Sequence, residues 1–143
     1  MKEKERKRIL ISGYFDPLHV GHLDLIAKAK ELGDHLIVVV NNDEQAILKK
    51  GRSFMPEKER VDILKSLKLV DEVILSIDKD RTIRKTLEMI KPDVFANGGD
   101  RIDGIIPEQE VCERLGIEIK NNLGGKLQSS SKLTGLAGTY TPN

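Results

Sequence analysis

Five short runs of apolar and β-branched residues, separated by segments with helical spacing, constrain the fold of this 143-residue chain most strongly. The run at 36–40 reads Leu-Ile-Val-Val-Val, which predicts a strand buried on both faces. Strand-type runs that alternate with helical segments are typical of a parallel sheet with crossover helices. We therefore expect a single α/β domain over 1–143, with an open five-stranded parallel sheet and helices on both faces.

The boundaries of these elements follow from their spacing and from flanking proline and glycine residues. Strands are predicted at 7–12, 34–40, 72–76, 93–96 and 117–119. Helices are predicted at 23–32, 56–67, 82–91 and 107–115. Ile83, Leu87 and Ile90 form a stripe that should face the core. We expect 41–52 and 121–131 to be polar loops, and 1–7 and about 136–143 to be mobile.

The segment 12–22 joins the first predicted strand to the first predicted helix. His19 and His22 are three residues apart, so on a helix they share one face. A helix N-terminus favours an anion, and Gly21 lets a ligand approach the backbone closely. These features predict a phosphate site. Two alternatives stay open: the histidines cap the helix, or they bind a metal, for which only His35 and Cys112 remain as further His or Cys ligands.

The complete string is more specific than the histidine pair. Gly13-x-Phe15-Asp16-x-x-His19-x-Gly21-His22 resembles the G-x-F-D-x-x-H-x-G-H signature of the nucleotidylyltransferase superfamily at every fixed position. The superfamily includes glycerol-3-phosphate cytidylyltransferases, heptose-phosphate adenylyltransferases and archaeal FAD synthetases. The resemblance implies a Rossmann-like fold and transfer of a nucleotidyl group from a nucleoside triphosphate to a phosphorylated acceptor, with Mg²⁺ as cofactor and pyrophosphate as product.

The resemblance also implies roles for the residues of this segment. His19 and His22 would donate hydrogen bonds to the phosphates. The residues implied to form the rest of the nucleotide-binding turn are Gly13, Tyr14, Phe15, Asp16 and Gly21. Asp16 would orient the turn or help to position the metal, which is otherwise held mainly by substrate phosphates.

Basic residues after the second predicted strand and in the second predicted helix are the next candidates. Ligands of open parallel sheets lie beyond the carboxyl ends of the strands, which brings 41–52 close to 12–22. The resemblance implies that Lys49 or Lys50 closes over the triphosphate, and the sequence does not choose between them. Arg60 matches an acidic-x-Arg pattern of the family, and the alternative is a salt bridge to Glu57.

Two later loops complete the predicted site. Asn97, Gly98, Gly99 and Asp100 follow a buried strand, where the resemblance implies contacts to the nucleobase and ribose; the alternative is plain turn chemistry. Ser129, Ser130 and Ser131 would bind the β- and γ-phosphates, unless they are a flexible linker. The arginine that usually precedes these serines is absent, and the sequence leaves open whether Lys126 replaces it as a point charge.

Several substrate pairs are compatible with this resemblance. We favour CTP with an acceptor such as glycerol 3-phosphate, because the chain has the size of a single-domain enzyme. The sequence Gly98-Gly99-Asp100 instead favours ATP with a sugar phosphate such as heptose 1-phosphate, and FMN is a third acceptor. Outside the class, the alternatives are a regulatory nucleotide-binding module without turnover and a zinc protein.

Composition narrows the range of partners. The chain has 24 Lys and Arg against 23 Asp and Glu, and its net charge of +1 gives no case for nucleic acid. Its longest apolar run is far shorter than the ~20 residues that span a bilayer, so we expect no membrane partner. With a single cysteine and no signal-like segment, we expect a cytoplasmic protein. Many members of the superfamily are dimers, which makes a homodimer an open alternative.

Overall fold

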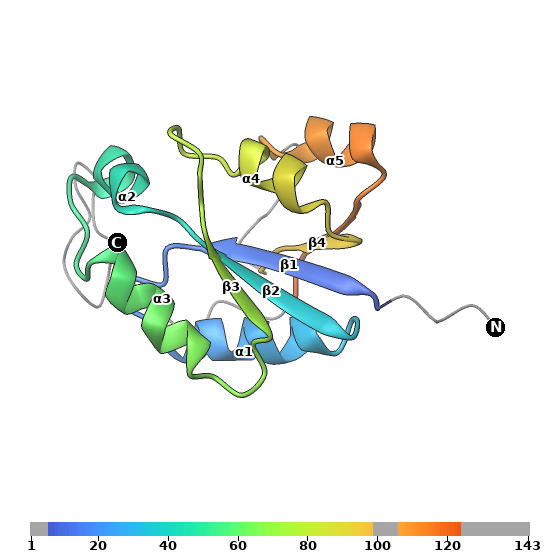
Figure 1. Cartoon of the computed structure of the whole chain (residues 1–143), viewed down its shortest axis with the longest axis horizontal. Helices are drawn as coiled ribbons and strands as arrows, with labels where there is room; N and C mark the ends of the chain where they lie inside the picture. Colours follow the sequence, from blue (N-terminus) through green and yellow to red (C-terminus); the bar gives the residue numbers. More distant parts are fainter. Residues whose placement is uncertain (1–5, 99–105, 124–143) are drawn as a thin grey trace.

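A computed structural model describes residues 6–98 and 106–123 of the chain. Its five strands form one parallel sheet in the order β3-β2-β1-β4-β5 (Figure 1). The strands are β1 (Arg8–Gly13), β2 (His35–Val40), β3 (Glu72–Leu75), β4 (Val94–Ala96) and β5 (Glu118–Lys120). The predicted open parallel sheet is confirmed, and each strand lies within one residue of its predicted position at either end.

Within these described ranges, five helices connect or flank the strands. They are α1 (Val20–Lys30), α2 (Asp43–Lys50), α3 (Glu57–Lys65), α4 (Arg84–Ile90) and α5 (Gln109–Leu115). Four of them correspond to predicted helices. The fifth, α2, lies within 41–52, so the prediction of a loop there is wrong. Asn42 and Gln45 form a reciprocal capping box that starts this helix, and Gly51 ends it in the left-handed conformation (φ 88°).

Two apolar clusters cover the two faces of the sheet. On one face, α1 and α3 pack against Ile9, Ile11 and alternate residues of β2. On the other, α4 and α5 pack against Leu10 and the remaining residues of β2 (Figure 1). Every residue from 36 to 40 is buried, because β2 contributes to both clusters. The stripe Ile83, Leu87 and Ile90 faces the second cluster as predicted.

The carboxyl ends of the strands gather the loops that carry the predicted site residues. β1 leads into the histidine segment, β2 into Asn41, and β4 into Asn97. β1 lies between β2 and β4. The chain first adds β2 and β3 on one side of β1, and then returns to add β4 and β5 on the other side. The switch point of the topology therefore lies between β1 and β4. In folds of this kind, a nucleotide binds at that crevice.

Candidate active site

The two histidines stack on each other at the N-terminus of α1. Their ring centroids are 3.8 Å apart, with planes at 19°. The backbone N–H of Gly21 donates to His19 Nδ1 at 3.1 Å, and that of His19 donates to His22 Nδ1 at 3.1 Å. A backbone N–H can only donate, so each neutral ring carries its proton on Nε2. Both Nε2 atoms are therefore donors suited to an anion near the helix N-terminus.

Phe15 explains how the histidine segment keeps its shape. Its ring is buried and meets the His22 ring edge to face, with centroids 4.8 Å apart. The residue has a left-handed backbone (φ 52°), which is uncommon for a bulky side chain and is tolerated where the surroundings fix it. A Cβ on Gly13 would lie 3.1 Å from the Phe15 ring, so glycine there lets the ring pack over the end of β1.

Asp16 joins the histidine segment to the chain that follows α2. Its carboxylate is fully buried and accepts hydrogen bonds from the backbone N–H groups of Phe54 (2.7 Å) and Met55 (2.6 Å). The buried Lys50 ammonium lies 3.1 Å from the same carboxylate. All of these contacts are internal, and they tie the turn after β1 to the end of α2 and to the segment before α3.

The two adjacent lysines of α2 have different surroundings. Lys50 is buried against Asp16, whereas Lys49 is exposed and its Nζ lies 4.5 Å from the centroid of the Tyr14 ring. This is a cation–π contact at the histidine segment. Of the two, Lys49 is therefore the one placed to meet a ligand. The lysine is carried by a capped helix rather than by the predicted loop.

Arg60 on α3 holds three loops together. Its side chain is 1% exposed, and it donates to the carbonyl oxygens of Met55 (2.9 Å), Tyr14 (2.8 Å) and Asn41 (2.7 Å) and to the Asp43 carboxylate (2.7 Å). Four of its five N–H donors are thus used inside the protein. These bonds tie the ends of β1 and β2 to the starts of α2 and α3.

The carboxylate that pairs with Arg60 is Asp43, not the Glu57 named as the alternative from sequence. Glu57 instead accepts a hydrogen bond from the Asp43 backbone N–H at 2.7 Å, and Asp43 accepts from the Glu57 N–H at 3.3 Å. These reciprocal bonds tie the start of α2 to the start of α3.

Of the predicted nucleobase loop, the described part is Asn97 and Gly98. Asn97 is buried, and its side-chain amide donates to the Asn121 side chain at 3.0 Å. Its backbone carbonyl accepts from Leu123 N–H at 3.1 Å. The ends of β4 and β5 are thereby cross-linked. Gly99, Asp100, Lys126, Ser129, Ser130 and Ser131 lie outside the described residues.

Sequence reasoning missed Gln45, which is central to the site. Its side chain is fully buried and bonds the Asn42 backbone N–H and the Asn41 side chain on one side. On the other side, its amide donates to the carbonyl oxygens of Asp80 (2.6 Å) and Thr82 (2.8 Å). The spacing of Asn42 and Gln45 matches a capping box, and this was the available signal.

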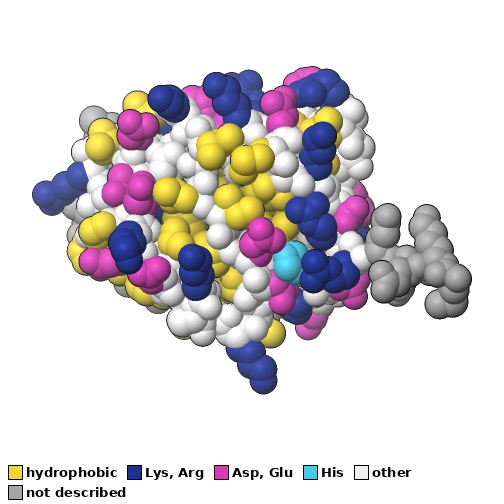
Figure 2. Space-filling model, viewed as in Figure 1, with side chains coloured by type: hydrophobic (Ala, Val, Ile, Leu, Met, Phe, Trp, Pro, Cys, Tyr) yellow, Lys and Arg dark blue, Asp and Glu magenta, His cyan; other side chains and the backbone are white. Residues whose placement is uncertain are grey.

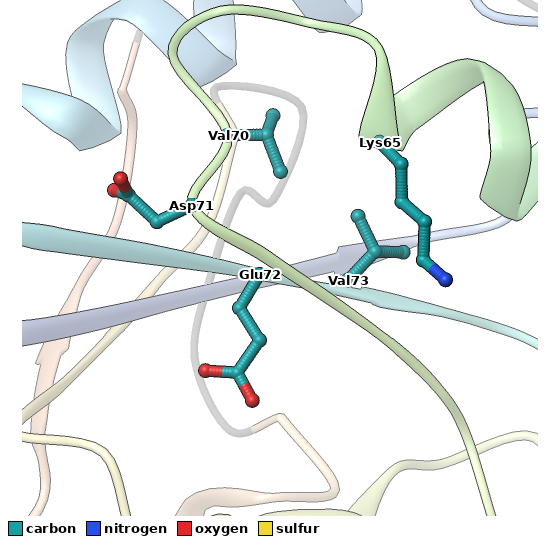
Figure 3. A pocket seen from close by; sticks show the side chains of 5 residues that line it. All are labelled: Lys65, Val70, Asp71, Glu72 and Val73. Atoms are coloured by element: carbon teal, nitrogen blue, oxygen red, sulfur yellow. The ribbon is translucent and has the colours of Figure 1, made fainter.

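A separate cavity lies on the β3 side of the molecule, remote from these loops. It has a volume of about 310 Å³ and is lined by Lys65, Val70, Asp71, Glu72 and Val73 (Figure 3). These residues lie at the end of α3 and the beginning of β3, so the cavity is near the amino end of that strand. It shares none of the candidate residues.

Metal-binding side chains do not cluster in the part of the chain that the structure describes. No group of three or more His, Cys, Asp or Glu residues there could hold a metal ion. A tetrahedral zinc site takes four protein or water ligands, and His19 and His22 already use Nδ1 as backbone acceptors. Within the same described ranges, no helix is long and apolar enough to cross a membrane.

Sequence comparison shows which family combines this sheet with this histidine segment. A family model described as cytidylyltransferase-like matches residues 10–126. The chain belongs to the cytidylyltransferase-like family. The predicted membership of the nucleotidylyltransferase superfamily is confirmed, and with it the expected enzyme class, a nucleotidyltransferase.

Relatives of this chain include several FAD synthases. The chain is 34% identical to a Pyrococcus abyssi FAD synthase (84% of this chain, 81% of that protein) and 39% identical to one from Thermococcus onnurineus (85% and 78%). It is also 34% identical to the bifunctional protein HldE of Koribacter versatilis, over 77% of this chain and 23% of that protein.

A solved structure supports the same fold. The lipopolysaccharide core biosynthesis protein of Thermoplasma volcanium superposes with a TM-score of 0.71 at 32% identity, over 82% of this chain and 95% of that one. The FAD synthase relatives favour the adenylyl alternatives over the CTP and glycerol 3-phosphate pair that the chain length favoured.

Proposed function

We propose that this protein transfers AMP from ATP to a phosphorylated small-molecule acceptor and releases pyrophosphate. The observation that supports this most directly is the stacked pair of His19 and His22, which presents two Nε2–H donors at a helix N-terminus. FMN is the first acceptor to test, because the relatives named above include FAD synthases of similar length.

The proposed reaction requires no covalent intermediate with the protein. An oxygen of the acceptor phosphate attacks the α-phosphorus of ATP, and the bond from that phosphorus to the bridging oxygen breaks. Pyrophosphate leaves with the electron pair. Since the attacking oxygen is already anionic, no general base is required, and catalysis depends on alignment and on neutralising charge on the leaving group.

His19 and His22 are the catalytic donors in this proposal. Their Nε2–H groups would bind the phosphates as negative charge develops on the leaving pyrophosphate. Lys49 would supply a positive charge to the same phosphates from α2. Asp16, Lys50 and Arg60 would hold the loops of the site in position, since their polar groups are used inside the protein.

Magnesium would arrive as part of the substrate, MgATP. Mg²⁺ is commonly held by substrate phosphates with one or two carboxylates, and the described residues contain no denser carboxylate cluster. When bound, the ion neutralises phosphate charge.

A second candidate acceptor is a sugar phosphate of the heptose 1-phosphate type. It is favoured by the sequence Asn97-Gly98-Gly99-Asp100, which is similar to that of heptose-phosphate adenylyltransferases, and by the HldE relative. The homodimer stays a prediction, to be tested by light scattering after size-exclusion chromatography.

Pyrophosphate release tests the proposal. Purified protein with Mg²⁺ is assayed with ATP or CTP against FMN, heptose 1-phosphate and glycerol 3-phosphate. We expect release with ATP and one of the first two acceptors. Release only with CTP would overturn the adenylyl assignment, and nucleotide binding without release from any pair would favour the regulatory module.

A further inference from the structure

The loop between β3 and α4 brings a third cationic side chain to the site. Buried Gln45 bonds the carbonyl oxygens of Asp80 and Thr82, which flank Arg81 on both sides. Lys49 lies one helical turn after Gln45, so the two side chains share a face of α2. Arg81 and Lys49 are therefore held on the same side of α2.

Both of these cations act on Tyr14. Lys49 Nζ is 4.5 Å from its ring centroid. Burial raises the pKa of the Tyr14 phenol above its ordinary value, and the positive charges of Arg81 and then Arg60 act against this rise. The hydroxyl is buried, and no group in the described ranges completes a hydrogen bond with it at ordinary distance.

Arg81 has no acidic neighbour to neutralise it in the described part of the chain. The adjacent Asp80 carboxylate accepts from the Thr82 backbone N–H (2.9 Å) and hydroxyl (2.7 Å) and pairs with Arg84 at 3.1 Å. Among the residues described, no carboxylate lies within ion-pair distance of Arg81, whose side chain is exposed. An exposed guanidinium next to a second cation is suited to an anion.

Strand order separates this guanidinium from the nucleotide crevice. The crevice lies between β1 and β4, whereas Arg81 follows β3, two strands away from β1 on the other side. The reaction must bring two anions together at the α-phosphorus, one from each substrate. Lys49 follows β2, next to β1, and is assigned to the nucleotide; Arg81 follows β3, one strand further out, and is placed to neutralise the second anion.

We propose that Arg81 binds the phosphomonoester of the acceptor, with Tyr14 as the positioning residue beneath it. This inference rests on the proposed function, because it assigns the acceptor's phosphate to a part of that site. Arginine suits the role, since its planar fork can bind two phosphate oxygens at once.

Steady-state kinetics provide the first test. In Arg81→Gln, we expect KM for the acceptor to rise about 10- to 100-fold, while KM for ATP changes less than about 3-fold. Arg81→Lys should recover part of this loss. The matched control is Lys85→Gln, which removes an exposed positive charge four residues away, leaves the Asp80–Arg84 pair intact and should keep both KM values. An equal rise in both KM values, or none in either, would overturn the proposal.

A binding measurement separates failure of this inference from failure of the proposed function. Inorganic phosphate is titrated by ³¹P NMR line broadening into protein saturated with α,β-methylene ATP, which occupies the nucleotide site without transferring AMP. We expect phosphate to bind the wild type and Lys85→Gln, and to bind Arg81→Gln about 10-fold more weakly or worse. Equal binding by all three proteins would refute the Arg81 assignment even if no acceptor supported turnover. Absence of turnover with Arg81-dependent phosphate binding would instead count against the proposed acceptors alone.

Discussion

At the scale of single residues, each histidine of the proposed active site would have two separate tasks, one for each ring nitrogen. Nδ1 accepts a backbone hydrogen bond and shapes the start of α1. Nε2 carries the proton that can be donated to a phosphate. The structural alternative raised by the sequence, histidines that cap the helix, and the functional one are therefore compatible in the same side chains.

Substitutions of His22 can separate these tasks. In His22→Asn, the side-chain oxygen can replace Nδ1 as an acceptor, so we expect the melting temperature to stay near that of the wild type. Turnover should fall by about 10² or more, because the preorganised Nε2–H donor is lost. His22→Ala should lose turnover equally and also lose about 0.5 to 2 kcal/mol of stability with the cap.

Pyrophosphate release and thermal unfolding measure the two effects. His35→Asn is the matched control, because His35 pairs with Glu72 at the beginning of β2 and β3, away from the site. It should keep full turnover. Turnover of His22→Asn at the wild-type rate would contradict the catalytic role.

The adjacent lysines of α2 should respond in opposite ways to the same substitution. Lys49→Gln removes an exposed charge, so we expect lower turnover by about 10-fold or more with unchanged stability. Lys50→Gln leaves the buried Asp16 carboxylate without its cation, so we expect a loss of about 3 to 5 kcal/mol in the free energy of unfolding. Urea unfolding and the release assay on both variants provide the comparison. Equal stability of the two would show that the Asp16–Lys50 pair contributes little.

At the scale of elements, the site depends on how loops are tied to helices. Arg60 on α3 bonds the loop after β1, the loop after β2 and the start of α2. The identity of Arg60 was visible in the sequence, but its partners were not, because three of the four are groups 17 to 46 residues away along the chain, two of them backbone carbonyls. Sequence patterns identify local partners such as Glu57 more readily than such long-range acceptors.

Arg60→Lys should therefore be costly although it conserves charge. An ammonium cannot reach four acceptors that are arranged around a planar guanidinium, so buried carbonyl oxygens lose their donors. We expect the free energy of unfolding to fall by about 2 to 4 kcal/mol in urea unfolding. Arg114→Lys is the control, because Arg114 makes exposed ion pairs with Glu88 and Glu110 and should tolerate the change. Equal losses in the free energy of unfolding of the two variants would argue against this role of the Arg60 hydrogen bonds.

Helix α2 is the element that the sequence did not predict. Helix α2 was expected to be loop, because 44–52 is mostly polar and lacks an apolar stripe. Ile47 and Leu48 are each 55% exposed, so the helix is not held by apolar burial. It is held instead by the Asn42 and Gln45 capping box and by the link from Asp43 to α3. Periodicity finds helices that pack on a core, and this one is stabilised mainly by hydrogen bonds.

At the scale of the whole molecule, the sheet was predictable because it depends on apolar burial, whereas α2 depends mainly on hydrogen bonds and was not predicted. Strands buried on both faces must be apolar throughout, and the helices that cover them show core-facing stripes. The positions of the site loops followed from the parallel topology. The face seen in Figure 2 carries interspersed acidic and basic side chains, in keeping with the net charge of +1.

An acidic residue at the amino edge of the sheet couples stability to pH. Asp71 accepts from Lys30 Nζ at 2.6 Å and from Leu36 N–H at 2.8 Å, which links α1, β2 and the start of β3. Partial burial acts to raise the pKa of the Asp71 carboxyl, but these hydrogen bonds outweigh it and hold the pKa below its ordinary value. The carboxylate therefore contributes stability above its unfolded-state pKa, and this contribution is lost as pH falls through the folded-state pKa.

Asp71→Asn isolates this contribution. We expect the variant to be less stable than the wild type at neutral pH, and the difference to shrink at an acidic pH below about 3.9, the ordinary pKa of this carboxyl in an unfolded chain. Urea midpoints at the two pH values test this. A difference that stays constant or grows on acidification would exclude the carboxylate as its source.

Lys49 is delivered by a helix with a capping box at one end and a left-handed glycine at the other, and Arg60 fixes the loops beside it. Its charge is thus in place before any substrate arrives. The work of assembling like charges at one edge of the sheet is done once, during folding, and need not be repeated in every turnover. Solvent viscosity should then affect the rate only through diffusion of substrates and products, not through the travel of this cation.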